Sequence, residues 1–106
     1  MKRISVSILN FNGEKNTLEC VESLKKIDTS KFKVNIIVID NGSAERLNLK
    51  DSQWDNASLK VIRSEKNLGF SGGHNVGIEY ALKKGSDFIV ILNNDTYVDK
   101  NFLDEL

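Results

Sequence analysis

An unbroken apolar run, Ile89-Val90-Ile91-Leu92, ends abruptly in the polar segment Asn93-Asn94-Asp95-Thr96. A short apolar run without alternation predicts a strand buried on both faces, the kind that builds parallel sheets. In open α/β sheets, ligands bind at the carboxyl ends of such strands. The sequence therefore predicts a candidate site just after Leu92, and Asp95 is the first candidate there for chemistry.

Three other apolar stretches also end in polar residues, so the pattern predicts four strands over 4–9, 34–39, 59–63 and 87–92. Helical spacing of apolar residues predicts helices over 16–26 and 75–84, and residues 101–106 resemble the start of another. The part between 44 and 58 gives no clear pattern, and the glycine-rich part over 64–74 is expected to be a loop. This order favours an α/β fold of three layers, a mostly parallel twisted sheet with helices on both faces. Residues 1–106 are expected to form a single domain.

Charge and cysteine content exclude several classes of protein. Fifteen basic and fifteen acidic residues cancel, which argues against a nucleic-acid partner held by bulk charge. Cys20 is the only cysteine, so it can form no internal disulfide, and its place in a predicted helix suggests a small buried residue. No apolar run approaches the roughly 20 residues that a membrane span needs. A reducing, cytoplasmic location is expected.

Several common motifs are absent. The glycines at 69, 72, 73 and 77 do not form the G-x-G-x-x-G dinucleotide fingerprint, and no P-loop sequence occurs. His74 is the only histidine, which excludes a site built on two histidines.

What remains is a set of polar segments at the predicted strand ends, over 10–13, 40–43, 67–75 and 93–96, which a doubly wound sheet would bring to one edge. Asp40 can accept hydrogen bonds from a nucleobase or a ribose. Gly72 and Gly73 let backbone approach a ligand closely, and the helix expected near Gly73 can present N–H groups to phosphate. Asp95 can supply the one carboxylate that Mg²⁺ takes beside substrate phosphates. The set suits a nucleoside diphosphate that carries a leaving group.

These same segments resemble the successive motifs of family 2 glycosyltransferases, and in particular those of the rhamnosyltransferase-like bacterial members. The matching stretches are VSILNFN from Val6, VIDNGS from Val38, NLGFSGGHNVG from Asn67 and LNNDT from Leu92. The resemblance covers nearly the whole chain in the right order.

The resemblance implies a partial GT-A fold, the nucleotide-diphospho-sugar transferase fold, with sheet order 3-2-1-4 for the four predicted strands. It implies a UDP- or dTDP-sugar donor, a divalent cation (Mg²⁺ or Mn²⁺), and transfer with inversion to a saccharide or glycolipid acceptor in polysaccharide biosynthesis. By position, Asp95 resembles the metal-binding carboxylate. The residues expected to bind the nucleotide are Asn10, Phe11, Asn12, Asp40, Asn67, Gly72, Gly73, His74 and Asn94.

The chain departs from the family pattern at two positions. Asn93 replaces the first acidic residue of the D-x-D metal motif, so metal affinity is expected to depend on the bound diphosphate. His74 lies near the place where many relatives carry an arginine, and it is equally compatible with a phosphate contact and with a turn.

Family members run well beyond 106 residues. Residues 1–106 are therefore expected to be the N-terminal, donor-binding half of a longer enzyme, truncated before its catalytic base. The full-length enzyme is expected to be peripheral to the inner face of the membrane. The fourth strand would then be an open edge, prone to homodimer formation.

Two alternatives stay open at this point. One is a non-catalytic nucleotide-binding or interaction module. The other is that the strand-end polar residues only cap and turn the chain, which suits Asn41 and Ser43 individually.

Overall fold

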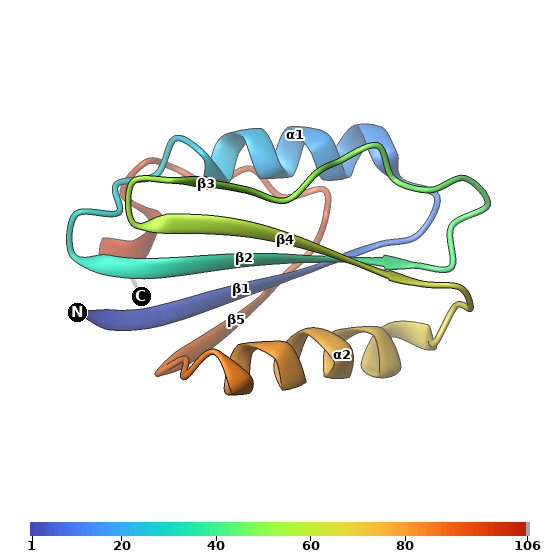
Figure 1. Cartoon of the computed structure of the whole chain (residues 1–106). Helices are drawn as coiled ribbons and strands as arrows, with labels where there is room; N and C mark the ends of the chain where they lie inside the picture. Colours follow the sequence, from blue (N-terminus) through green and yellow to red (C-terminus); the bar gives the residue numbers. More distant parts are fainter. Residues whose placement is uncertain (106) are drawn as a thin grey trace.

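The computed structural model describes residues 1–105 and contains one five-stranded sheet between two layers (Figure 1). Along the chain the elements are β1 (Lys2–Asn10), α1 (Glu14–Leu24), β2 (Phe32–Asn41), β3 (Ser52–Trp54), β4 (Ala57–Ser64), α2 (Gly69–Lys83), β5 (Phe88–Leu92) and a short 3₁₀ helix, η1 (Phe102–Glu105). The spatial order of the strands is β3-β4-β2-β1-β5. The expected α/β fold is confirmed, and so is the order 3-2-1-4 for the four predicted strands.

The four long strands are parallel, which brings their carboxyl ends to one edge of the sheet. Asn10 at the end of β1 pairs with Asp40 of β2, and Asp40 pairs in turn with Arg63 of β4. On the other side of β1, Ile8 pairs with Leu92, the last residue of β5. We call this edge the carboxyl edge of the sheet.

Each face of the sheet has its own core. Buried residues of β1, β2 and α1 pack on the first face, where the segment after β5 adds Leu103 and the segment before β3 adds Leu47. The second face is covered by α2, whose buried Ala81 packs on Ile37 and Ile39 of β2. In Figure 1, α1 lies above the sheet and α2 below it. The expectation of cover on both faces is thus confirmed for the centre of the sheet.

The part between 44 and 58, which showed no clear pattern, contains a strand. Ser52–Trp54 pairs antiparallel with β4 through a tight hairpin, and Trp54 lies opposite Ala57. Asp55 in the turn has a positive φ of 45°, which aspartate tolerates better than most residues. The sheet is therefore mixed, and Trp54 packs at the rim of the first core.

The expectation that the fourth strand is buried on both faces is wrong. β5 is an edge strand of the sheet, and Phe88 and Ile91 are 55% and 47% exposed. The apolar pattern arises because Val90 and Leu92 pack against the first core and Ile89 against the second. An apolar run therefore does not distinguish a central strand from an edge strand that contacts both cores.

Residues 69–74 of the glycine-rich part are helical rather than a loop, because α2 begins at Gly69 and not near residue 75, whereas residues 65–68 form a loop as expected. Two of its glycines allow the helix to lie very close to the sheet. A Cβ on Gly73 would be 2.4 Å from Leu9 Cδ1, and one on Gly77 would be 2.6 Å from Ser7 Oγ. Glycine is used here for close packing, which overrides its poor helix propensity.

Two smaller boundaries also differ. α1 begins at Glu14, after Gly13, and not at Asn16. The expected helix at the end of the chain is the 3₁₀ turn Phe102–Glu105, and its last expected position, 106, lies outside the described residues. None of the helices among residues 1–105 has the length and apolar character that crossing a membrane requires.

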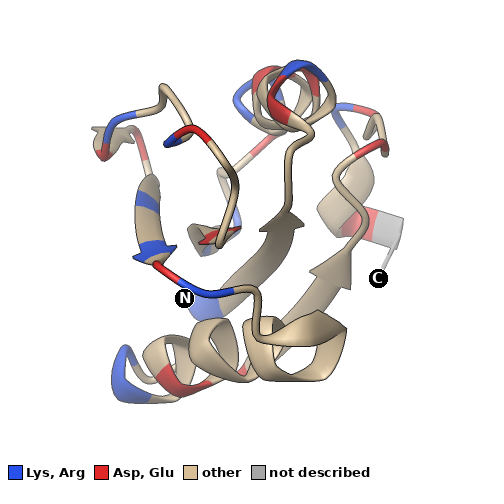
Figure 2. Ribbon diagram, turned by 90° about the vertical axis from the view of Figure 1, so that its right-hand side faces the viewer, with Lys and Arg blue, Asp and Glu red and all other residues tan. Residues whose placement is uncertain are grey.

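Charge is distributed without a dominant sign. Figure 2 shows basic and acidic positions mixed along α1 at the top, whereas the first turns of α2 at the bottom carry neither. The part of α2 without Lys, Arg, Asp or Glu runs from Gly69 to Ile78. The beginning of this part adjoins the carboxyl edge of the sheet, so the charge near that edge comes from the strand ends and the loops.

Candidate functional site

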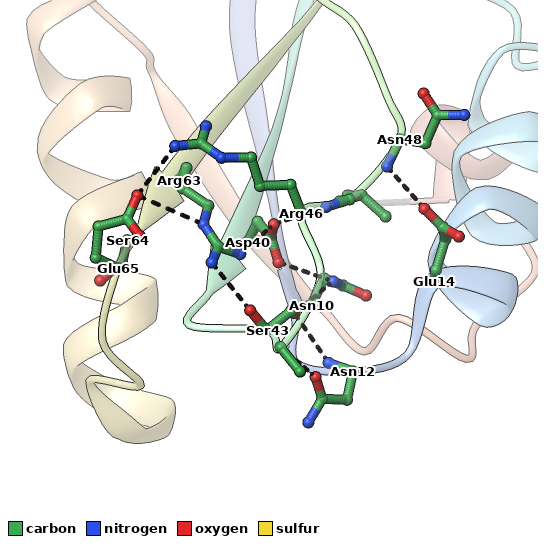
Figure 3. Close-up of polar contacts among 12 residues, drawn as sticks. Asn10, Asn12, Glu14, Asp40, Ser43, Arg46, Asn48, Arg63, Ser64 and Glu65 are labelled. Atoms are coloured by element: carbon green, nitrogen blue, oxygen red, sulfur yellow. Dashed lines mark hydrogen bonds and ion pairs between the residues drawn. The ribbon is translucent and has the colours of Figure 1, made fainter.

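Asp40 and Asn10 lie side by side at the carboxyl edge and are both buried. Asn10 Nδ2 donates to Asp40 Oδ1 at 3.1 Å and to Ser43 Oγ, also at 3.1 Å. Asp40 Oδ2 accepts from the backbone N–H of Leu47 at 2.9 Å and from an Arg63 guanidinium nitrogen at 2.9 Å. Both carboxylate oxygens are thus used by the protein itself (Figure 3).

These contacts keep Asp40 ionised. Burial by itself raises the pKa of the carboxyl, but donors from the Leu47 backbone, Ser43, Arg63 and Asn10 outweigh it, so the pKa lies below its ordinary value of 3.8. Arg63 also donates to the Ser43 carbonyl at 2.9 Å. The charged Asp40 orders the loop after β2 in two ways. It accepts directly from the Leu47 N–H of this loop, and it holds Arg63, which in turn donates to the Ser43 carbonyl of the same loop.

The loop after β1 is held in place by Ser43 and Ala44 of the loop after β2. Asn12 has a positive φ of 52°. Its backbone N–H donates to Ser43 Oγ at 2.9 Å, and its side-chain oxygen accepts from the Ala44 N–H at 2.8 Å. The two loops are therefore tied to one another across the ends of β1 and β2.

Between these loops is a pocket of about 300 Å³. Its lining consists of Asn10, Asn12, Glu14, Ser43, Ala44, Glu45, Arg46 and Leu47. We call it the β2 pocket. At its rim, Glu14 accepts from the Asn48 N–H at 2.7 Å, and Arg46 forms an exposed ion pair with Glu65 at 3.2 Å (Figure 3). The pocket offers side-chain amides, a hydroxyl and charges of both signs, groups that suit a polar heterocycle or a sugar.

A second pocket, of about 260 Å³, lies at the ends of β1 and β5 against the start of α2. Its lining consists of Leu9, Phe70, His74, Leu92, Asn93, Asn94 and Asp95. We call it the β5 pocket. It combines an exposed carboxylate with two side-chain amides and an imidazole. The predicted residues His74, Asn94 and Asp95 therefore meet in one place.

His74 is a buried residue of α2, so the expectation that it belongs to a loop or turn is wrong. Its Nδ1 lies 2.9 Å from Ser7 Oγ, and the Phe70 ring contacts its ring edge to face at 4.7 Å between centroids. Burial lowers its pKa below the ordinary value of 6.5, so the ring is neutral at neutral pH. Its predicted contact with phosphate would then be a hydrogen bond and not an ion pair.

Asp95 is exposed at the mouth of the β5 pocket, and the donor set around it can be tested for a divalent cation. Among residues 1–105, no three His, Cys, Asp or Glu side chains form a cluster. The oxygens near Asp95 are instead the amide oxygens of Asn93 and Asn94, which line the same pocket. Hard cations accept such oxygens, and Mg²⁺ commonly takes one or two carboxylates and completes its shell with water and phosphate. The residues fit a cation that arrives with a diphosphate.

Five predicted binding residues line neither pocket, namely Asp40, which is buried, and Phe11, Asn67, Gly72 and Gly73. Asn67 Oδ1 accepts from the Gly69 N–H at 2.8 Å and from Asn41 Nδ2 at 3.0 Å, so it orders the start of α2. Gly72 and Gly73 lie in the first turns of that helix. Phe11 is 48% exposed beside the β2 pocket. Their contact with a nucleotide stays a prediction.

Several side chains of the site were missed in the sequence, among them two that hold Asn10 and Asp40. Arg63 is the cationic partner of Asp40, and Thr17 of α1 donates to Asn10 Oδ1 at 2.5 Å. A signal existed for Arg63, because a basic residue that ends a predicted strand is placed beside an acidic residue that ends its neighbour. Thr17 lies on the buried face of an amphipathic helix, where the sequence pattern indicates only a packing role for a threonine. The lone Cys20 is buried as expected, and burial raises its pKa to about 11.

Two larger surface depressions, of about 710 and 740 Å³, lie away from the carboxyl edge. The first borders the amino ends of β2 and β4, and the second lies between α1 and the segment around Tyr97. Neither contains a residue predicted for the site. Position relative to the strand ends is a better guide here than size, because ligands of open α/β sheets bind at carboxyl ends.

A mostly parallel sheet with pockets at its carboxyl edge is the arrangement in which proteins of the α/β class bind their ligands. The glycosyl transferase family 2 model matches residues 5–106. The chain belongs to this family, and its fold is the GT-A fold of the solved relatives.

Among curated proteins, the chain is 30% identical over 105 residues to the poly(ribitol-phosphate) beta-N-acetylglucosaminyltransferase TarS of Staphylococcus aureus, covering 97% of this chain and 18% of TarS. It is 28% identical over 100 residues to the dTDP-rhamnosyl transferase RfbF of Shigella flexneri, covering 93% of this chain and 31% of RfbF. The hexosyltransferase Agl10 of Haloferax volcanii, of low-salt glycan biosynthesis, is 28% identical over 105 residues, with 97% of this chain and 31% of Agl10 covered.

Crystal structures of S. aureus TarS in complex with UDP and with UDP-GlcNAc each superpose with a TM-score of 0.77 at 28% identity. Each covers 99% of this chain and 30% of the TarS chain in the crystal. The chain thus spans less than a third of the length of these relatives.

Proposed function

We propose that residues 1–106 are the donor-binding part of a glycosyltransferase that uses a nucleotide-diphosphate sugar. The observation that carries the proposal is the placement of two polar pockets side by side at the carboxyl edge, one around Asn10 and Asn12 and the other around Asp95. Relatives whose names or titles include UDP, UDP-GlcNAc and dTDP-rhamnose support a UDP- or dTDP-sugar as donor.

In this proposal the nucleoside occupies the β2 pocket and the diphosphate lies toward the β5 pocket. Asn12 and Arg46 line the first pocket with accessible polar groups, while Asp40 lies buried behind them and holds the loops in place. Asp40 thus acts on the nucleoside chiefly by ordering Ser43 and the loop after β2. Phe11, exposed beside this pocket, offers a ring face to a base.

In the β5 pocket, Asp95 would hold a divalent cation, Mg²⁺ or Mn²⁺, together with the diphosphate. Such a cation stabilises the negative charge that develops on the departing diphosphate. Asn93 and Asn94 add neutral oxygens and N–H groups, so the pocket itself carries little negative charge against the anionic ligand. His74 adds a neutral ring whose free nitrogen can donate a hydrogen bond when Nδ1 accepts from Ser7.

For the complete protein we propose transfer with inversion at the anomeric carbon to a saccharide or glycolipid acceptor in polysaccharide biosynthesis. The names of two curated relatives, which include poly(ribitol-phosphate) and glycan biosynthesis, support a role in building a surface polymer or glycan. We further propose a location in the cytoplasm, on the inner face of the membrane, where nucleotide sugars and lipid-linked acceptors meet.

The second candidate is a non-catalytic nucleotide-binding module. The open side of β5 and the single carboxylate at Asp95 favour it, because both leave the site less complete than a D-x-D motif inside a continuous sheet. Release of free nucleoside diphosphate from a UDP- or dTDP-sugar by the full-length protein, with or without an acceptor, distinguishes the two. The module would bind the donor and release nothing.

Titration of UDP, dTDP and GDP against the ¹⁵N-labelled chain, with and without Mn²⁺, tests donor binding. We expect UDP or dTDP to shift the amides of Asn12 and Ser43, and Mn²⁺ to raise the affinity by about tenfold or more. If no nucleotide perturbs a resonance at the carboxyl edge, the proposal that this chain binds the donor is wrong.

A matched pair of variants tests the metal. Asp95→Asn is expected to keep the metal-free affinity for UDP and to lose the gain from Mn²⁺. Asp55→Asn, in the hairpin turn at the other end of the sheet, is expected to keep both. An unchanged Mn²⁺ effect in Asp95→Asn would remove Asp95 from the metal site.

We also propose that the isolated chain forms a homodimer through β5. Its outer side has no neighbouring strand in the described sheet, and the exposed Phe88 and Ile91 lie along it. A second copy can pair there strand to strand, since unpaired N–H and C=O groups at an apolar edge favour such pairing.

A further inference from the structure

A continuous chain of side-chain hydrogen bonds crosses the carboxyl edge, and Thr17 is its middle. Asn94 Nδ2 donates to Thr17 Oγ1 at 3.1 Å, and Thr17 Oγ1 donates to Asn10 Oδ1 at 2.5 Å. Asn10 Nδ2 then donates to the Asp40 carboxylate at 3.1 Å. We call the three side chains of Asn94, Thr17 and Asn10 the Thr17 bridge.

The direction of every bond in the Thr17 bridge is determined by chemistry. The Thr17 hydroxyl has one proton, which goes to the amide oxygen of Asn10, so the hydroxyl must accept from the Asn94 amide. The bonds therefore point the same way and end on an anionic carboxylate, an arrangement in which each bond polarises the next. Thr17 is fully buried, so water does not compete for its hydroxyl.

The Thr17 bridge joins the two pockets of the site. Asn10 lines the β2 pocket and Asn94 lines the β5 pocket, while Thr17 lines neither. Asn94 Nδ2 also lies close to Gly13, where a Cβ would be only 2.7 Å from it. Its neighbour in sequence is Asp95, so the position of the bridge sets where the exposed carboxylate stands.

We propose that Thr17 is a positioning residue that couples the two pockets. By holding Asn94 to Asn10, it makes occupation of the β2 pocket favour the arrangement of Asn94 and Asp95 that binds a diphosphate with its cation in the β5 pocket. This inference rests on the proposed donor site. Coupling between two sites is reciprocal, so a ligand in the β5 pocket must strengthen binding in the β2 pocket by the same factor.

Two separate probes measure this coupling, uridine for the β2 pocket and pyrophosphate with Mn²⁺ for the β5 pocket. In the unchanged chain, saturation with one probe is expected to raise the affinity for the other by about fivefold or more. Thr17→Val keeps the shape and removes the hydroxyl, and we expect the factor to fall to about 1. Thr17→Ser restores the hydroxyl and is expected to restore the coupling, which a role in packing alone would not require.

A variant at the exposed end of the bridge guards against misfolding of Thr17→Val. Asn94→Ala removes the first donor near the surface and is expected to abolish the coupling as Thr17→Val does. A coupling factor in Thr17→Val or Asn94→Ala equal to that of the unchanged chain would overturn the inference.

A measurement without ligand separates the inference from the proposed function. In the ligand-free chain, Asn94→Ala is expected to shift the amide resonances of Asp40 and Ser43, and the shift should vanish when Thr17→Val is already present. If neither probe binds the unchanged chain, the donor site is refuted as an explanation of these pockets. The Thr17 bridge is refuted separately if Asn94→Ala leaves the Asp40 and Ser43 resonances in place.

Discussion

At the scale of single residues, the site depends on a buried charge that faces inward. Asp40 accepts from β1, from β4 and from the loop after β2, and its guanidinium partner Arg63 is also largely buried. A buried ion pair is costly to break from one side, because the remaining charge loses its partner. Asp40 therefore links the stability of the chain to the geometry of the β2 pocket.

Asp40→Asn tests this link. The amide cannot replace the charge that faces Arg63, so we expect the free energy of unfolding to fall by about 2–4 kcal/mol. Urea unfolding followed by circular dichroism measures it. The matched control is Asp104→Asn, whose exposed pair with Lys31 spans 3.8 Å and should matter by less than about 0.5 kcal/mol. Equal effects of the two substitutions would contradict a special role of Asp40.

His74 gives a prediction for pH. Its pKa is lower in the folded chain than the ordinary 6.5, so the unfolded chain binds a proton first as the pH falls. The free energy of unfolding should therefore decrease as the pH falls below 6.5 toward the folded pKa, and stay constant above that range.

Urea unfolding at about pH 7.5 and about pH 5.5 measures this loss. In His74→Gln, which retains an acceptor for Ser7 and has no titrating ring, the loss should be smaller. A loss of the same size in both proteins would assign it to other groups.

At the scale of elements, the position of α2 depends on two glycines that face the sheet. Gly73 and Gly77 have no side chain where the helix meets Leu9 and Ser7, so α2 lies close to β1 and its first turns reach the carboxyl edge. This closeness is what brings His74 and Phe70 into the β5 pocket. The packing of one helix therefore builds one wall of the site.

Gly73→Ala should push this helix away from the sheet. Its new methyl would overlap Leu9, and we expect a loss of about 1–3 kcal/mol in the free energy of unfolding, although alanine favours the helix. Gly72→Ala is the control, since its methyl would meet only Leu68 Cβ at 3.0 Å and Leu68 is partly exposed. We expect a change within about 1 kcal/mol there. Equal free energies of unfolding for Gly73→Ala and Gly72→Ala would contradict a special packing role of Gly73.

At the scale of the whole molecule, we expect the exposed side of β5 to govern self-association of the chain in solution. Ile91→Lys places a charge on this edge, and we expect it to shift the proposed homodimer to monomer in light scattering at high concentration. The control is Leu82→Lys, which removes an exposed apolar side chain from α2 instead and should leave the dimer intact. A monomeric unchanged chain would refute the homodimer outright.

The sequence by itself determined the four long strands, their order and the edge where the site lies. Apolar runs that end in Asn10, Asp40 and Asn93 carry this information locally, because burial and strand ends leave their pattern in neighbouring residues. It also supplied the family, through motifs at those same ends.

Only the tertiary structure decided which polar side chains face inward and which line the pockets. Asp40 meets Arg63, and Thr17 meets Asn10 and Asn94, through contacts between segments far apart in the chain. The same holds for the early start of α2 and for the exposure of Phe88 and Ile91 on β5, since both depend on what a segment packs against. The local sequence pattern indicates whether a residue is buried or polar, but its contacts depend on which distant segments the fold brings next to it.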